Sequence, residues 1–213
     1  YLGGQHRMWV GAFSTHNGVC DWATTHGQNS GYTWKEEGLS IAVDATAGVA
    51  VGGRLVGNAP DFEAVTPAGA FHRPTGGAFV VLFEPLNYTI RWASAFGGHP
   101  LPGQPPHTQV SDMRFVKKNG PQKLWITGMS IGDNAYWDGL DYTLPTQLPN
   151  GDPLPPDAFY HDHGMAFLAS CDVTSLHLDY CTGWGQGTAT SATDLMSAAY
   201  GLDYDGQHLW MVG

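Results

Sequence analysis

The 213-residue sequence predicts an all-β fold of the β-propeller type, and three observations lead to that prediction. One hairpin pattern occurs three times, a second hairpin pattern follows each copy, and the stretch "FVVLF" (79–83) is apolar at every position. Repeated units of four antiparallel strands in about 45 residues are typical of propeller blades, which have two apolar faces and must stack on neighbours. A strand that is apolar throughout fits a sheet covered on both faces.

The first hairpin pattern aligns without a gap on Trp22, Trp92 and Tyr180. The three copies are "WVGAFSTHNGVCDW" (9–22), "FVVLFEPLNYTIRW" (79–92) and "FLASCDVTSLHLDY" (167–180). Each copy begins as an apolar strand, breaks at turn-forming residues in the same columns and resumes as a second strand that ends in the aromatic residue. We expect these aromatic side chains to pack in the core.

The second hairpin pattern occupies 39–53, 112–128 and 201–213, and each copy has a turn that contains Gly48, Gly120 or Gly206. The two patterns together predict one domain over residues 1–213, with about three four-stranded antiparallel units. The predicted units span about 7–53, 79–128 and 167–213. Two long loops, 54–77 and 129–164, lie between them and are expected to be functional or to cover another part of the protein.

These motifs resemble a known family. Assembled from 78–98 and 41–52, the pattern "AFVVLF…W…FGG…IAVD…G…V…G" is similar to the bacterial-type seven-bladed β-propeller repeat, the SBBP repeat. The resemblance covers about two thirds of the chain, and the second and third units depart from it at "KKNGPQK", "RFVK" and "GLDYD". It implies an extracellular or cell-surface location, and it brings no family-wide catalytic residues.

Three units do not close a propeller ring, for which about four to eight are needed. The stretch "YLGGQHRMWVG" (1–11) also matches "DYDGQHLWMVG" (203–213), so the N-terminal strand fits both the first and the last position of a unit. With Tyr1 in place of Met, this suggests a processed or partial chain, or a ring completed across subunits. The expected partners are therefore other copies of the chain or further repeats of a longer chain.

Charge and hydropathy exclude two classes of partner. The net charge of −10, from 19 acidic and 9 basic residues, would repel a phosphate backbone, so nucleic acid is not expected. No apolar run reaches 18 residues, so no membrane span is predicted. The contacts that we still expect are pairing through exposed strand edges and binding of a glycan.

Two groups of polar residues are candidate metal ligands. His161 and His163 flank Asp162 in "YHDHG", and neutral imidazoles suit zinc or copper. The stretch "GDNAYWDGLD" supplies oxygen ligands for calcium, and no other cofactor is expected. The order of these ligands misses the usual calcium-loop spacing, and a solvated acidic turn is the alternative. These oxygen ligands are Asp133, Asn134, Asp138 and Asp141.

Two kinds of covalent modification are also candidates. Asn87 begins the sequon Asn87-Tyr88-Thr89 and would carry a glycan in a secreted protein. The three cysteines allow at most one internal bridge, either Cys171–Cys181 or one that involves Cys20. Small buried thiols are the alternative.

The sequence contains no nucleophile elbow and no recognisable Cys/His arrangement, so no enzyme activity is predicted. The favoured function is an extracellular structural module, a subunit of a surface layer, filament or larger propeller that acts through strand and loop contacts between subunits. The alternative is a ligand- or glycan-binding propeller that uses Tyr136 and Trp137. A metal-dependent lyase or hydrolase with His161 and His163 is the third hypothesis.

Overall fold

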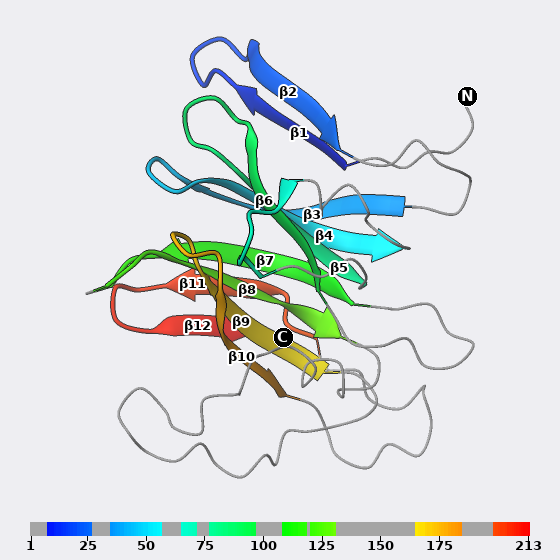
Figure 1. The fold of residues 1–213 in the computed structure, drawn as a ribbon, viewed down its shortest axis with the longest axis vertical. Coiled ribbons are helices and arrows are strands. Elements are labelled where there is room, and N and C mark those ends of the chain that lie inside the picture. Colours follow the sequence, from blue (N-terminus) through cyan, green and yellow to red (C-terminus); the bar gives the residue numbers. More distant parts are fainter. Residues whose placement is uncertain are drawn as a thin grey trace.

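The computed structural model describes residues 8–26, 35–56, 65–71, 77–96, 108–118, 120–130, 165–184 and 198–213. Twelve β-strands supply nearly all of the regular structure in these residues (Figure 1). They are β1 (Met8–Phe13), β2 (Cys20–His26), β3 (Lys35–Asp44), β4 (Gly48–Val56), β5 (Ala78–Phe83), β6 (Ile90–Phe96), β7 (Gln109–Val116), β8 (Lys123–Ser130), β9 (Met165–Asp172), β10 (Leu178–Trp184), β11 (Gly201–Tyr204) and β12 (Leu209–Val212).

The predicted all-β, propeller-like fold is confirmed, with four of these strands in each predicted unit. Eight strands form one curled antiparallel sheet of order β10-β9-β8-β7-β4-β5-β6, with β3 paired to β4, and the sheet makes a half-barrel (Figure 1). The β1–β2 and β11–β12 hairpins are separate two-stranded sheets. All pairings between these strands are antiparallel, both within the hairpins and between strands that long connections join.

The sheet differs from a set of separate four-stranded blades in its hydrogen bonding. Strand β4 of the first unit pairs with β5 of the second, from Val49↔Phe83 to Gly53↔Phe79. Strand β8 of the second unit pairs with β9 of the third along its whole length. Each pairing satisfies the backbone groups of an edge that a separate blade would leave open, so neighbouring units share one sheet.

The three first hairpins have the same register, which confirms the gap-free alignment. The aromatic residue of each copy pairs with the same column of the preceding strand, and the register shifts directly before the aromatic residue. These pairs are Ala12↔Trp22, Leu82↔Trp92 and Ser170↔Tyr180. Strand β1 therefore takes the first-strand position of its unit.

The turns of these hairpins are also the same. Each is closed by a backbone hydrogen bond of 2.8 or 2.9 Å, from Ser14 N to Val19 O, Glu84 N to Thr89 O and Asp172 N to His177 O. The fifth turn residue has a left-handed backbone in every copy: Gly18 (φ 72°), Tyr88 (φ 54°) and Leu176 (φ 59°). Only the first copy has glycine at this position, and glycine adopts a left-handed backbone without steric cost.

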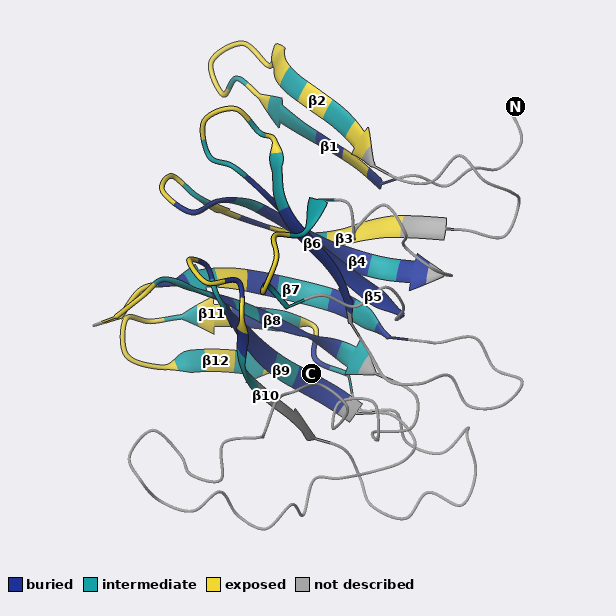
Figure 2. Ribbon diagram, viewed as in Figure 1, coloured by how far each residue is buried: buried dark blue, intermediate teal, exposed yellow. Residues whose placement is uncertain are grey.

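Alternate residues of a strand face opposite sides, so each first hairpin has two faces. We call the face that carries the first residue of each aligned copy (Trp9, Phe79 or Phe167) the forward face. The opposite face, which carries the aligned aromatic residue, is the rear face. Strand β5 is buried on both, as "FVVLF" predicted (Figure 2). Residues Phe79, Val81 and Phe83 share an apolar cluster with Met8 and Val10, and Trp22 contacts the Phe83 ring edge-on at 5.5 Å.

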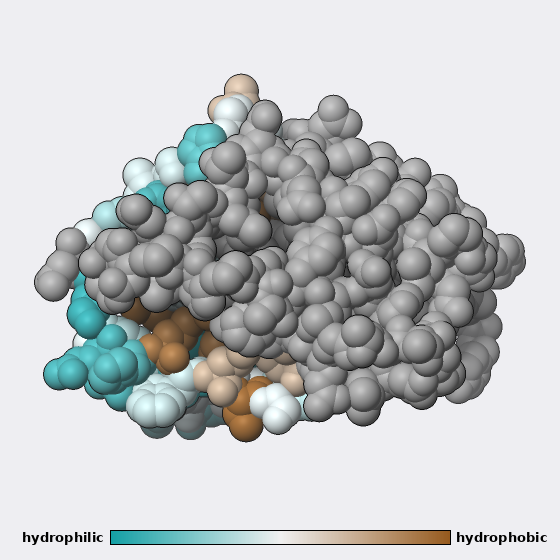
Figure 3. Space-filling model, turned by 90° about the horizontal axis from the view of Figure 1, so that it is seen from below, coloured by the Kyte–Doolittle hydropathy of each residue, from teal (hydrophilic) through white to brown (hydrophobic). Residues whose placement is uncertain are grey.

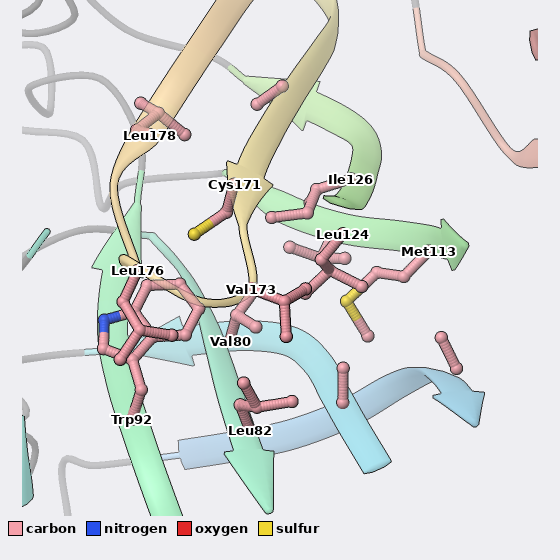
Figure 4. Close-up of a cluster of buried hydrophobic side chains, with 14 of the residues drawn as sticks. Val80, Leu82, Trp92, Met113, Leu124, Ile126, Cys171, Val173, Leu176 and Leu178 are labelled. Carbon is pink, nitrogen blue, oxygen red and sulfur yellow. The ribbon is translucent and has the colours of Figure 1, made fainter. Parts of the chain in front are cut away.

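The opposite face of β5 packs towards the third unit. Val80, Leu82 and Trp92 share a second cluster with Phe167, Ala169 and Cys171 (Figure 4). The Trp92 indole is fully buried and donates to the Phe71 carbonyl at 2.7 Å, and Phe71 N in turn donates to Leu176 O at 2.8 Å. The first hairpins therefore stack in chain order, each rear face against the next forward face.

The second hairpins stack in the same order. Gly52 of β4 lies so close to Val110 of β7 that a methyl group there would be 2.7 Å from the Val110 side chain. On the other side of the β7–β8 pair, Asp112 accepts a hydrogen bond from Leu202 N at 2.8 Å, and Arg114 Nε donates to Leu202 O at 3.0 Å. The three units thus form one continuous stack.

Candidate interaction surfaces

The forward face of the first unit is open to solvent. Trp9 and Phe13 are 56% and 51% exposed, and their rings lie 5.9 Å apart. The residues in the same columns of the second unit, Phe79 and Phe83, are 0% and 1% exposed. A face that is covered in the second and third units is therefore aromatic and uncovered in the first.

Strand β3 carries a second exposed apolar row. Leu39, Ile41 and Val43 are 47%, 51% and 69% exposed, whereas the alternate residue Ala42 is buried. Ile41 pairs with Val51, so the two side chains lie on the same face of the sheet. Val51 shares an apolar cluster with Met8, which places this face on the forward side of the stack. We call Trp9, Phe13, Leu39, Ile41 and Val43 the front surface.

The β11–β12 hairpin carries the matching surface at the other end. Leu202 is buried against the sheet, while Trp210 and Val212 point outward and are 61% and 66% exposed. Tyr200, which precedes β11, is 67% exposed. We call Tyr200, Trp210 and Val212 the rear surface. Seen from below, the described part of the molecule shows apolar residues next to polar ones (Figure 3).

Eight of the ten large hydrophobic residues exposed in the described part of the chain belong to these two surfaces. The other two, Val19 and Leu86, lie in the turns of the first hairpins. Single exposed apolar residues are ordinary, but apolar residues gathered at a surface mark an interaction site.

An aspartate orients the rear-surface tryptophan. Asp205 Oδ2 accepts the Trp210 indole N–H at 2.8 Å, and Asp205 Oδ1 accepts the backbone N–H groups of Gln207 and His208 at 2.7 Å each. Led by the His208 backbone bond, these hydrogen bonds lower the pKa of Asp205 well below its usual range. The carboxylate is thus charged at neutral pH, and it fixes the ring before any partner arrives.

The candidate metal ligands lie outside the described residues: His161, His163, Asp133, Asn134, Asp138 and Asp141, and with them Tyr136 and Trp137 of the ligand-binding alternative. In the segments that the structure does describe, no group of three or more His, Cys, Asp or Glu residues could hold a metal ion. Both metal sites stay predictions.

Asn87 has a structural role that needs no glycan. Its Oδ1 accepts hydrogen bonds from Thr89 N at 3.1 Å and from the Thr89 hydroxyl at 2.9 Å. Asn17, in the same column of the first unit but outside any sequon, accepts from Val19 N at 3.0 Å in the same way. The asparagine is explained by the turn, and its glycosylation stays a prediction.

The cysteines differ in exposure. Cys20 is exposed, whereas Cys171 is buried, and burial is the main cause that raises the pKa of its thiol above the usual range. The side chain of Cys181 lies outside the described residues, so the Cys171–Cys181 bridge stays a prediction.

The sequence analysis did not single out the residues of the front and rear surfaces. Trp9 and Phe13 stand in the same columns as the buried Phe79 and Phe83, and the residue types on both strands are similarly apolar. The sequence pattern therefore does not separate the exposed side chains from the buried ones, because exposure depends on which neighbouring unit covers a face.

No protein-family model and no curated protein matches this sequence. Within the described residues there is no helix of the length and hydropathy needed to cross a membrane.

Proposed function

We propose that the protein is an assembly module whose front surface stacks on the rear surface of another copy, as a subunit of an extracellular layer, filament or larger propeller. One observation carries the proposal: the forward face that is covered by a neighbouring unit at Phe79 and Phe167 is open at Trp9. The stacking order inside the chain gives the geometry for a contact between chains.

The chemistry of the two surfaces supports such a contact. Exposed tryptophans are common anchors of protein interfaces, because they bury a large apolar area at low entropic cost. The front surface presents Trp9, and the rear surface presents Trp210 with its ring held by Asp205. Each further large side chain on these surfaces is already about half-buried, so its complete burial adds about 1 kcal/mol of favourable transfer free energy.

A front-to-rear contact joins two different patches, so it can repeat and generate a ring or a filament. The test is analytical ultracentrifugation of the 213-residue chain over a range of concentrations. Trp9→Glu should remove the front contact and Trp210→Glu the rear contact, and each variant alone should be monomeric. An equimolar mixture retains one intact front and one intact rear, so it should form a dimer and nothing larger.

Leu86→Glu is the matched control, because Leu86 is 92% exposed and lies on neither surface, and it should assemble as the unaltered chain does. Monomeric behaviour of the unaltered chain at high concentration contradicts the proposal. Dimers of the Trp210→Glu variant alone would instead indicate a front-to-front contact.

A further inference from the structure

The structure contains a hollow that the assembly proposal does not use. It lies between the β7–β8 turn region and the β11–β12 hairpin and has a volume of about 970 Å³. Its described lining is Val116, Lys118, Gly120, Pro121, Lys123, Trp125, Tyr204, Gln207 and Leu209. The volume is that of sites that take small ligands, about 300 to 1,000 Å³.

The charge of this lining is opposite to that of the protein. The chain carries −10 overall, yet the described lining has two lysines and no acidic residue. Lys123 Nζ lies 2.5 Å from Asp179 Oδ2, so its charge is already paired. Lys118 Nζ donates to the Gln207 carbonyl at 3.0 Å and forms no ion pair with a described carboxylate, so its ammonium group is available to an anion.

Aromatic rings supply the second recognition element. Trp125 is half-buried in the lining, and Tyr180 packs against it with ring centroids 5.6 Å apart, which fixes the orientation of the indole. Tyr204 lies on the other side of the hollow, and its hydroxyl donates to the Gly206 carbonyl at 2.8 Å. The negatively polarised face of an aromatic ring attracts C–H groups, which one side of a sugar ring presents.

We propose that this hollow binds an acidic saccharide, with a sugar ring against Trp125 and its carboxylate at Lys118. The Gln207 side chain is placed to bond a hydroxyl group, since an amide both donates and accepts. The ligand class follows from the combination: a neutral sugar leaves the ammonium group without an anion, and a simple inorganic anion leaves the aromatic ring without a partner.

The test is isothermal titration calorimetry of the full chain with a linear trigalacturonate, and with the neutral trisaccharide maltotriose as the comparison ligand. The acidic ligand should bind saturably, with a dissociation constant of about 0.1 to 1 mM, and maltotriose about ten-fold more weakly. Raising the salt from about 0.05 to 0.5 M should weaken the binding of trigalacturonate.

Lys117 and Lys118 offer a matched pair of variants, because both are exposed neighbours and only Lys118 lines the hollow. Lys118→Gln should weaken binding of trigalacturonate about five- to ten-fold, and Lys117→Gln less than two-fold. Trp125→Phe keeps a ring in place and should weaken both saccharides equally. No saturable binding of trigalacturonate, equal binding of the two saccharides, or equal effects of the two lysine variants would overturn the proposal.

Discussion

The β1–β2 and β5–β6 hairpins have the same local structure and opposite surroundings. Both have the same register, the same bulge and the same closing hydrogen bond of 2.8 Å. Every residue of β5 is buried, whereas β1 buries Met8 and Val10 and exposes Trp9 and Phe13 (Figure 2). Hairpin geometry is therefore set by the local sequence, whereas neighbouring units determine which faces of a hairpin are covered.

The largest expected difference lies between Phe79 and Trp9, which occupy the same column. Phe79→Ala removes a fully buried ring and should lower the free energy of unfolding by about 3 to 5 kcal/mol. Trp9→Ala removes a side chain that is more than half exposed and should cost about 1 kcal/mol or less in the monomer. Urea denaturation at low protein concentration measures both.

If Trp9→Ala destabilised the monomer as much as Phe79→Ala does, the front surface would be covered in solution. That result would contradict the difference in coverage between Trp9 and Phe79 and would remove the basis of the assembly proposal.

A smaller effect is expected at the left-handed turn position. Gly18 has φ 72° and no atom within 4 Å of where a methyl group would stand, so Gly18→Ala should cost about 1 to 2 kcal/mol through backbone strain alone. Tyr88 bears the same strain and stacks on Trp22 with ring centroids 4.7 Å apart, which offsets it. Thermal unfolding of Gly18→Ala, with Thr15→Ala in the same exposed turn as the control, measures this cost.

An unchanged melting temperature in Gly18→Ala would show that the first turn relaxes, and the turns of the hairpins would then not be equivalent.

The smallest expected effect depends on pH and concerns the β3–β4 turn. Asp44 Oδ1 accepts hydrogen bonds from the Thr46 hydroxyl at 2.7 Å and from Thr46 N and Ala47 N at 2.8 and 2.9 Å. Led by the Thr46 hydroxyl, these bonds lower the pKa of Asp44 to about 2, from 3.8. Because the folded-state pKa is the lower one, the stabilisation is complete above about pH 4 and is lost as the pH falls through about 2.

The expected contribution is about 1 kcal/mol, since solvent screens this surface carboxylate. Asp44→Asn keeps an accepting oxygen, so urea denaturation should find its stability reduced at pH 7 and the difference from the unaltered chain diminished at pH 2. A difference that stays constant between pH 7 and pH 2 would show that the charge of Asp44 has no part in the turn.

Much of the repeat could be predicted from the sequence. The aligned columns located the first hairpins, the position of their turns and the aromatic residues that follow, because turn chemistry and strand alternation act between residues close in the chain. The continuous apolar run at 79–83 predicted a strand buried on both faces, and that burial is observed. The local match of 1–11 to 203–213 did not decide the position of β1, and its pairing with β2 did.

The hairpins, the positions of their turns and the aromatic columns follow from the sequence alone. Only the tertiary structure decided that β4 joins β5 and β8 joins β9 in one curled sheet, that Trp9 and Trp210 are exposed, and that Trp125 and Lys118 line a common hollow. The physical reason is range: turns and alternation depend on near neighbours, whereas shared edges and covered faces depend on contacts between residues far apart in the chain.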